Sequence, residues 1–116
     1  MKNRPFHQRL GFAVAGIREG WRRERSFRTQ VLLGGLAVVA LLILRPAPIW
    51  WALFVLIIAL IWAMELMNSA LETLIDHLHP GLHDEIRALK DMAAGAVLVL
   101  SLASLVIAAM MLLSLI

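Results

Sequence analysis

Three long apolar runs, separated by short polar segments, dominate this chain. Residues 29–44 and 49–64 are two uncharged runs of 16 residues each, and residues 92–116 form a third of 25. A membrane-spanning helix needs roughly 17–25 mainly apolar residues, and flanking long side chains can reach the membrane surface to add length. The pattern therefore predicts three transmembrane helices, at about 29–44, 49–64 and 92–116.

The segment before the first run, residues 1–28, has a different pattern. Leu10, Val14, Ile17 and Trp21 recur at intervals of four, three and four residues. This spacing places them on one face of a helix, and the arginines of the segment lie mainly off that face. The segment therefore predicts an amphipathic helix that lies on the inner surface of the membrane.

Glu24 and Arg28 fall on the same face if that helix continues. It is unusual for the apolar face of a helix to continue with a carboxylate and a guanidinium. The alternative is that the helix ends or bends near residues 23–25 and leaves both side chains in solvent. The sequence pattern leaves both possibilities open.

Composition supports a membrane protein with a single domain. The 116 residues are 61% hydrophobic and only 16% charged, whereas a soluble domain has about 25% charged residues. A soluble protein of this size could not bury so much apolar surface, which argues against a soluble helical bundle. The absence of cysteine excludes a disulfide framework and a thiolate metal site.

The basic residues predict how the chain is oriented. Eight of the 11 lysines and arginines precede residue 30, one lies at position 45, and two lie within residues 65–91. Basic residues concentrate on the cytoplasmic side, so the N-terminus and residues 65–91 should face the cytoplasm. Because the basic arm adjoins a membrane span, anionic lipid is its nearer partner, and no nucleic acid is expected.

Acidic side chains gather on one edge of the helix that continues from the second run. At about 100° per residue, Glu72 and Asp76 fall within about 20° of Glu65, and Asn68 lies about 60° to one side. Carboxylate and carboxamide oxygens suit hard ions such as Mg²⁺. The alternative is a solvated acidic face, but Glu65 directly follows 16 uncharged residues, which favours binding.

The acidic edge requires a positive partner, because like charges four residues apart on a helix repel. The candidates are a divalent cation, Lys90, Arg87 or an arginine of the N-terminal arm. Lys90 could offer a point charge to a phosphate, and Asp91 could orient a metal or a ribose. The alternative for this pair is a lysine that reaches the membrane surface beside an interfacial aspartate.

The histidines do not indicate a metal site. His79 and His83 are four residues apart, but Pro80 and Gly81 between them should break a helix. We therefore expect residues 77–83 to form a polar cytoplasmic loop. The chain also lacks GxxxxGK and GxGxxG phosphate-binding loops.

Two motifs resemble the prokaryotic diacylglycerol kinase family, which includes the undecaprenol kinases. Residues 65–76 read E-x-x-N-S-A-L-E-x-x-x-D, and residues 90–97 read K-D followed by mainly small residues. The resemblance extends over the basic arm, the three spans and the polar segment between the last two. It implies an all-α integral membrane fold with an N-terminal surface helix and three spans. It also implies a homotrimer in the bacterial inner membrane, with active sites shared between neighbouring subunits.

The resemblance further implies that the γ-phosphate of MgATP passes to the primary hydroxyl of a membrane lipid. Glu65 would be the catalytic base, Glu24 and Glu72 would bind Mg²⁺, and Asn68 would support catalytic geometry. Five charged side chains would form the nucleotide site: Glu24, Glu72, Asp76, Lys90 and Asp91.

Diacylglycerol, which would give phosphatidic acid, is the first candidate for the acceptor lipid, and undecaprenol is the alternative. Gln30 stands where some diacylglycerol-type members carry an acid, and residues 93–98 look more like the undecaprenol-type members. A more distant alternative is a small proton-coupled transporter, in which Glu65 alone would matter among the polar residues.

Overall fold

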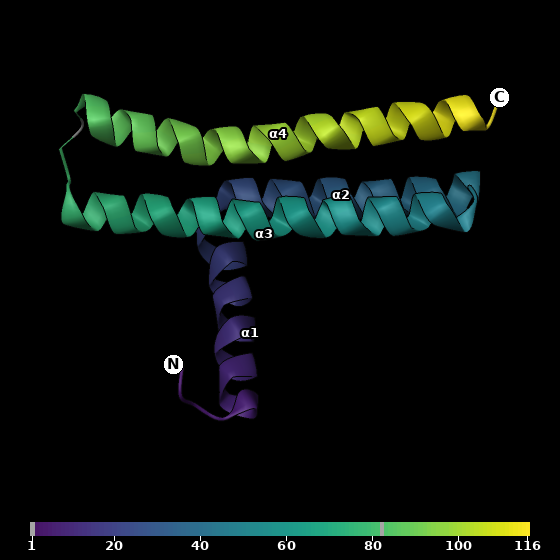
Figure 1. Cartoon of the computed structure of the whole chain (residues 1–116). Helices are drawn as coiled ribbons and strands as arrows, with labels where there is room; N and C mark the ends of the chain where they lie inside the picture. Colours follow the sequence, from purple (N-terminus) through teal and green to yellow (C-terminus); the bar gives the residue numbers. More distant parts are fainter. Residues whose placement is uncertain (1, 82) are drawn as a thin grey trace.

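A computed structural model describes residues 2–81 and 83–116, and within these ranges the chain is helical, with no strand. Figure 1 shows α3 and α4 lying side by side, α2 against α3, and α1 leaving the bundle at a steep angle. Three of the helices, α2, α3 and α4, are long and apolar enough to cross a membrane. The predicted all-α fold with three possible spans is therefore confirmed. The helix bounds are α1 Phe6–Arg23, α2 Arg25–Leu44, α3 Pro48–Leu78 and α4 Asp84–Ser114.

The helices α3 and α4 extend well beyond the apolar runs. The helix α3 continues through the second run to Leu78, and α4 begins at Asp84, before the third run. The side chains of Glu65, Glu72 and Asp76 therefore lie on the same uninterrupted helix as the second apolar run. His77 belongs to the last turn of α3, so the prediction of a loop over 77–83 is wrong at its start, and residue 82 lies outside the described residues.

The connection between α2 and α3 is a tight turn at residues 45–47. Arg45 ends α2 in the left-handed conformation, with φ 50° and ψ 55°. Pro48 occupies the first turn of α3, where the missing backbone N–H of proline has no helical partner to lose. The turn brings α2 back along α3 as an antiparallel neighbour.

The helix α3 is the centre of the bundle. Both α2 and α4 pack against it, whereas α2 and α4 make no close backbone contact with each other within the described residues. At the end remote from the acidic residues, a buried cluster contains one residue from each of α2, α3 and α4: Leu41, Phe54 and Met111. Between α2 and α4, over α3, an apolar cavity of about 440 Å³ remains.

The closest approach of α2 to α3 occurs at Gly34. A Cβ atom there would lie 2.8 Å from Cζ2 of Trp62 and 3.0 Å from Cγ2 of Ile58. The indole N–H of Trp62 donates a hydrogen bond to the Gln30 carbonyl at 3.0 Å, which holds the ring against α2. At Gly35 a Cβ would meet nothing within 4 Å.

We predict that Gly34→Ala destabilises the protein by about 1–3 kcal/mol, because the methyl group forces the Trp62 ring or α2 to move. Gly35→Ala is the matched control, since alanine is a better helix former than glycine and meets open space. Denaturant unfolding in detergent micelles measures both changes. Equal stability of the two variants would contradict the close packing at Gly34.

Candidate functional site

The connection between α1 and α2 is a single residue, Glu24. Its backbone is extended, with φ −112° and ψ 108°, and α2 begins at the next residue. The helix α1 thus ends where the sequence allowed for a bend. However, neither Glu24 nor Arg28 is left in open solvent, because both are partly buried.

Arg28 stabilises this bend from the α2 side. One guanidinium nitrogen donates hydrogen bonds to the carbonyls of Trp21 at 2.7 Å and Arg22 at 3.1 Å. Carbonyls in the last turn of a helix lack helical partners, and a cation is favourable beside them. Arg28 therefore ties the end of α1 to the start of α2 and thereby helps to fix the position of Glu24.

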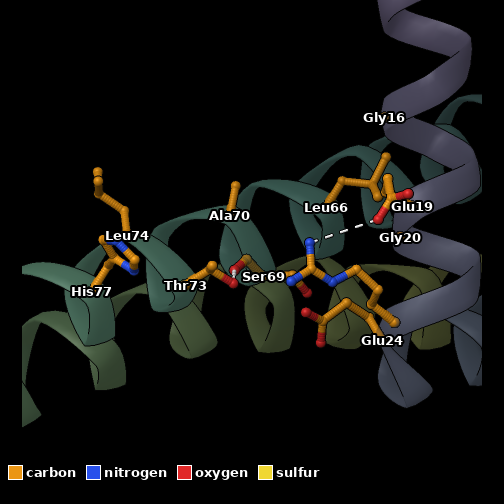
Figure 2. A pocket seen from close by; sticks show the side chains of 11 residues that line it. Gly16, Glu19, Gly20, Glu24, Leu66, Ser69, Ala70, Thr73, Leu74 and His77 are labelled. Carbon is orange, nitrogen blue, oxygen red and sulfur yellow. Dashed lines mark hydrogen bonds and ion pairs between the residues drawn. The ribbon is translucent and has the colours of Figure 1, made fainter. Parts of the chain in front are cut away.

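A cavity of about 470 Å³ lies between α1 and α3 (Figure 2). Glu24 lines it from the bend, and the Glu19 carboxylate, which pairs with Arg23 at 3.6 Å, lines it from α1. The two helices meet closely at Gly20, where a Cβ atom would overlap the Leu66 side chain. The wall contributed by α3 consists of Leu66, Ser69, Ala70, Thr73, Leu74 and His77.

Glu65 lies inside the helical bundle rather than on its surface. It is only 4% exposed and, with Ser69, is one of two buried polar side chains among the described residues. It follows Ile57 and Ile61 along the same buried face of α3. A carboxylate in such surroundings is costly unless it binds a partner, and no ion pair of Glu65 occurs within residues 2–81 and 83–116.

Asn68, beside Glu65 on α3, also has an unused polar atom. Its carboxamide oxygen is buried and has no hydrogen-bond partner in the part of the chain that the structure describes. Buried polar atoms normally have partners, so this oxygen is free to accept a hydrogen bond from a bound group.

An ion pair connects α4 to the acidic edge of α3. The Lys90 ammonium donates a hydrogen bond to the Asp76 carboxylate. Glu72, partly buried, lies one turn before Asp76, and Asp91 next to Lys90 is exposed. The structure thus brings Lys90 to the carboxylates with which the sequence associated it.

The two residues assigned to Mg²⁺ are not part of one cavity lining. Glu24 lines the cavity between α1 and α3, whereas Glu72 does not. Across the described residues, no group of three or more histidine, aspartate or glutamate side chains is placed to bind a metal. The carboxylates suit Mg²⁺, which is commonly held by one or two protein carboxylates together with substrate phosphates.

Sequence reasoning missed part of the cavity wall. Ser69, Thr73 and His77 line the cavity from α3. Their spacing of four residues could have shown that they share a helix face. Nothing in the sequence indicated that α1 would cover this face, because that depends on the direction in which α1 leaves the bend.

Comparisons with known proteins identify the family to which the chain is similar. Residues 11–112 match the family model of prokaryotic diacylglycerol kinase. A diacylglycerol kinase of Synechocystis is 31% identical over 103 residues, which are 88% of this chain but only 59% of that relative. The diacylglycerol kinase of Escherichia coli K12 is 32% identical over 77% of this chain and 73% of its own length. An undecaprenol kinase of Bacillus subtilis is 30% identical over 88% and 83%.

We predict that Arg28→Gln loosens the bend between α1 and α2, because the carbonyls of the last turn of α1 lose their charged donor. The chain has no cysteine, so spin labels can be attached to cysteines introduced at Gly11 on α1 and Leu71 on α3. Pulsed dipolar spectroscopy should show a broader distance distribution than in the parent. Arg25→Gln, at an exposed position near the bend, should leave the distribution unchanged. An unchanged distribution in Arg28→Gln would contradict its role.

Proposed function

The chain belongs to the prokaryotic diacylglycerol kinase family, and we propose that it transfers the γ-phosphate of ATP to the primary hydroxyl of diacylglycerol, giving phosphatidic acid. The family match and the names of the relatives support a lipid kinase. The single observation that carries the proposal is the buried Glu65, which directly follows the apolar run of α3 and shares one edge with further carboxylates.

Glu65 is proposed as the general base that takes the proton of the lipid hydroxyl. Ile57 and Ile61 on the Glu65 face of α3 line the apolar cavity between α2 and α4. A lipid chain in this cavity would have its polar end near Glu65, within the bundle. A base must come within hydrogen-bond reach of the hydroxyl proton, and this arrangement favours such an approach.

The nucleotide phosphates are proposed to bind near Lys90. Phosphoryl transfer depends mainly on positioning and on neutralising the charge of the phosphates, and Lys90 carries the needed positive charge to the carboxylate edge of α3. Asp91 would help to orient the nucleotide. The free carboxamide oxygen of Asn68 would accept a hydrogen bond from a group bound beside Glu65.

Glu24 and Glu72 are proposed as the protein ligands of Mg²⁺. The ion would neutralise phosphate charge, and phosphate oxygens would complete its coordination. Of these two carboxylates, only that of Glu24 lines the cavity between α1 and α3 within one chain. We therefore favour a homotrimer in which Glu24 and Glu72 of one metal site come from neighbouring subunits.

The proposed location is the bacterial inner membrane, with the N-terminus and the active site facing the cytoplasm. The three apolar helices and the prokaryotic family support the membrane. The concentration of arginines before residue 30 supports the orientation, because basic segments are retained on the cytoplasmic side. ATP is then available on the side that carries the acidic edge.

Undecaprenol is the second candidate acceptor. The undecaprenol kinase of Bacillus subtilis matches this chain over 88% of its length. Gln30, at a position where some diacylglycerol-type members carry an acid, lines the apolar cavity between α2 and α4. Both acceptors present a primary hydroxyl and require the same chemistry at Glu65, but the hydroxyl belongs to a glycerol diester in one and to a polyprenyl chain in the other.

We predict that the purified protein consumes ATP when diacylglycerol or undecaprenol is added in mixed micelles, and that Glu65→Gln lowers kcat by about 10²–10⁴-fold, as expected for loss of a general base. A phosphorylated lipid detected by mass spectrometry identifies the acceptor. Asp84→Asn, an exposed acid in the first turn of α4, is the matched control and should retain activity. Full activity of Glu65→Gln would refute the base assignment.

The proposed metal ligands lead to a further prediction. Glu24→Ala and Glu72→Ala should each raise the Mg²⁺ concentration for half-maximal activity by at least roughly tenfold, since each removes a charged ligand. Chains of the two variants, unfolded and refolded together, should regain part of the activity. In a mixed oligomer, one variant provides an intact Glu24 and the other an intact Glu72.

The refolding experiment separates the two assignments. Unchanged Mg²⁺ titrations of both single variants would refute the metal ligands. Altered titrations without recovery on mixing would instead place both carboxylates of each site in one chain. Each variant refolded alone serves as the control for recovery.

A further inference from the structure

We propose that Asp76 is a positioning residue, which holds the Lys90 ammonium at the acidic edge of α3 so that the ammonium can donate to an ATP phosphate while it stays paired with Asp76. The inference rests on the proposed lipid kinase function. It gives Asp76 a role distinct from binding the nucleotide itself, because its partner is the side chain that would contact the phosphates.

The geometry of the ion pair supports this role. Asp76 lies in the last turns of α3 and Lys90 in the second turn of α4. The pair therefore joins the two helices close to the connection between them. The Lys90 side chain is 28% exposed, whereas that of Asp76 is 60% exposed. The ammonium is therefore directed toward α3 and yet remains reachable from solvent.

No residue of its own helix could hold Lys90 in this position. The residues three or four positions away on α4 include no acid: Ile86, Arg87, Ala93 and Ala94. Arg87 would instead repel the ammonium. On α3, Glu72 lies four residues before Asp76, and Lys90 relieves the repulsion between these two carboxylates. The position of Lys90 therefore depends on Asp76.

Stability alone does not account for the pair. A partly exposed ion pair contributes about 0–1 kcal/mol, and α4 is already packed through buried apolar residues such as Ile86 and Val97. The larger effect is on the lysine side chain, whose free rotation is worth about 2 kcal/mol of entropy. Asp76 reduces the number of conformations that Lys90 must lose when phosphate binds.

The choice of lysine fits a side chain that contacts two partners at once. The chain contains nine arginines but only two lysines, Lys2 and Lys90. An arginine would bind a carboxylate with two parallel hydrogen bonds, whereas lysine is a compact charge on a flexible stem. The Lys90 ammonium has three N–H donors. It can therefore keep its bond to Asp76 and donate another to a phosphate oxygen without a movement of either helix.

A double-mutant cycle tests the proposal. Asp76→Asn should raise KM for ATP roughly three- to tenfold, the size expected from loss of a partly exposed ion pair, with a smaller change in kcat. Combined with Lys90→Ala, it should add nothing to the effect of Lys90→Ala alone, because Asp76 acts through Lys90. Asp76→Glu should recover part of the loss. Glu85→Gln, an exposed acid on α4, should leave KM unchanged.

Binding and stability measurements separate this role from a structural one. Affinity for a non-hydrolysable ATP analogue should follow the same non-additive cycle. The exchanged pair, Asp76→Lys with Lys90→Asp, should restore the unfolding midpoint but not the affinity. Additive effects, an unchanged KM and affinity in Asp76→Asn, or restored affinity in the exchanged pair would each overturn the proposal. If the parent chain phosphorylates no lipid, the proposed function is refuted, whereas the cycle of binding measurements still tests the role of Asp76.

Discussion

The cost of burying a carboxylate in an apolar helical bundle is the constraint on which this structure depends. Glu65 continues the buried face of α3 directly after the residues that pack within the membrane span. Because α3 runs without interruption from the apolar run to Leu78, the same helix both anchors the protein in the membrane and carries the acidic residues. The helix backbone therefore fixes the position of the candidate base relative to the lipid.

The other helices bring complementary groups to α3. The bend at Glu24, tied by Arg28, directs α1 across α3 and encloses a cavity at the membrane surface. The helix α4 returns antiparallel and delivers Lys90 to the acidic edge. In this way charged residues from distant parts of the chain lie beside the same half of one long helix.

The apolar and polar parts of the site lie at different levels along α3. The cavity between α2 and α4 is apolar and follows the membrane-buried part of α3. The acidic edge and Lys90 lie beyond this cavity, where α3 and α4 extend past the apolar runs. Along α3, Glu65 therefore lies between the apolar cavity and the ion pair of Asp76 with Lys90. This separation agrees with membership of a family that joins a membrane lipid to a phosphate.

The sequence by itself determined the three apolar helices, the turn at 45–48 and the alignment of Glu65, Glu72 and Asp76, because hydrophobic length, proline and helical period act locally. Only the tertiary structure decided that α1 bends at Glu24, that Arg28 closes this bend, and that Lys90 pairs with Asp76. These features depend on the directions in which separate helices pack. Such directions arise from contacts between residues far apart in the chain, which no local pattern encodes.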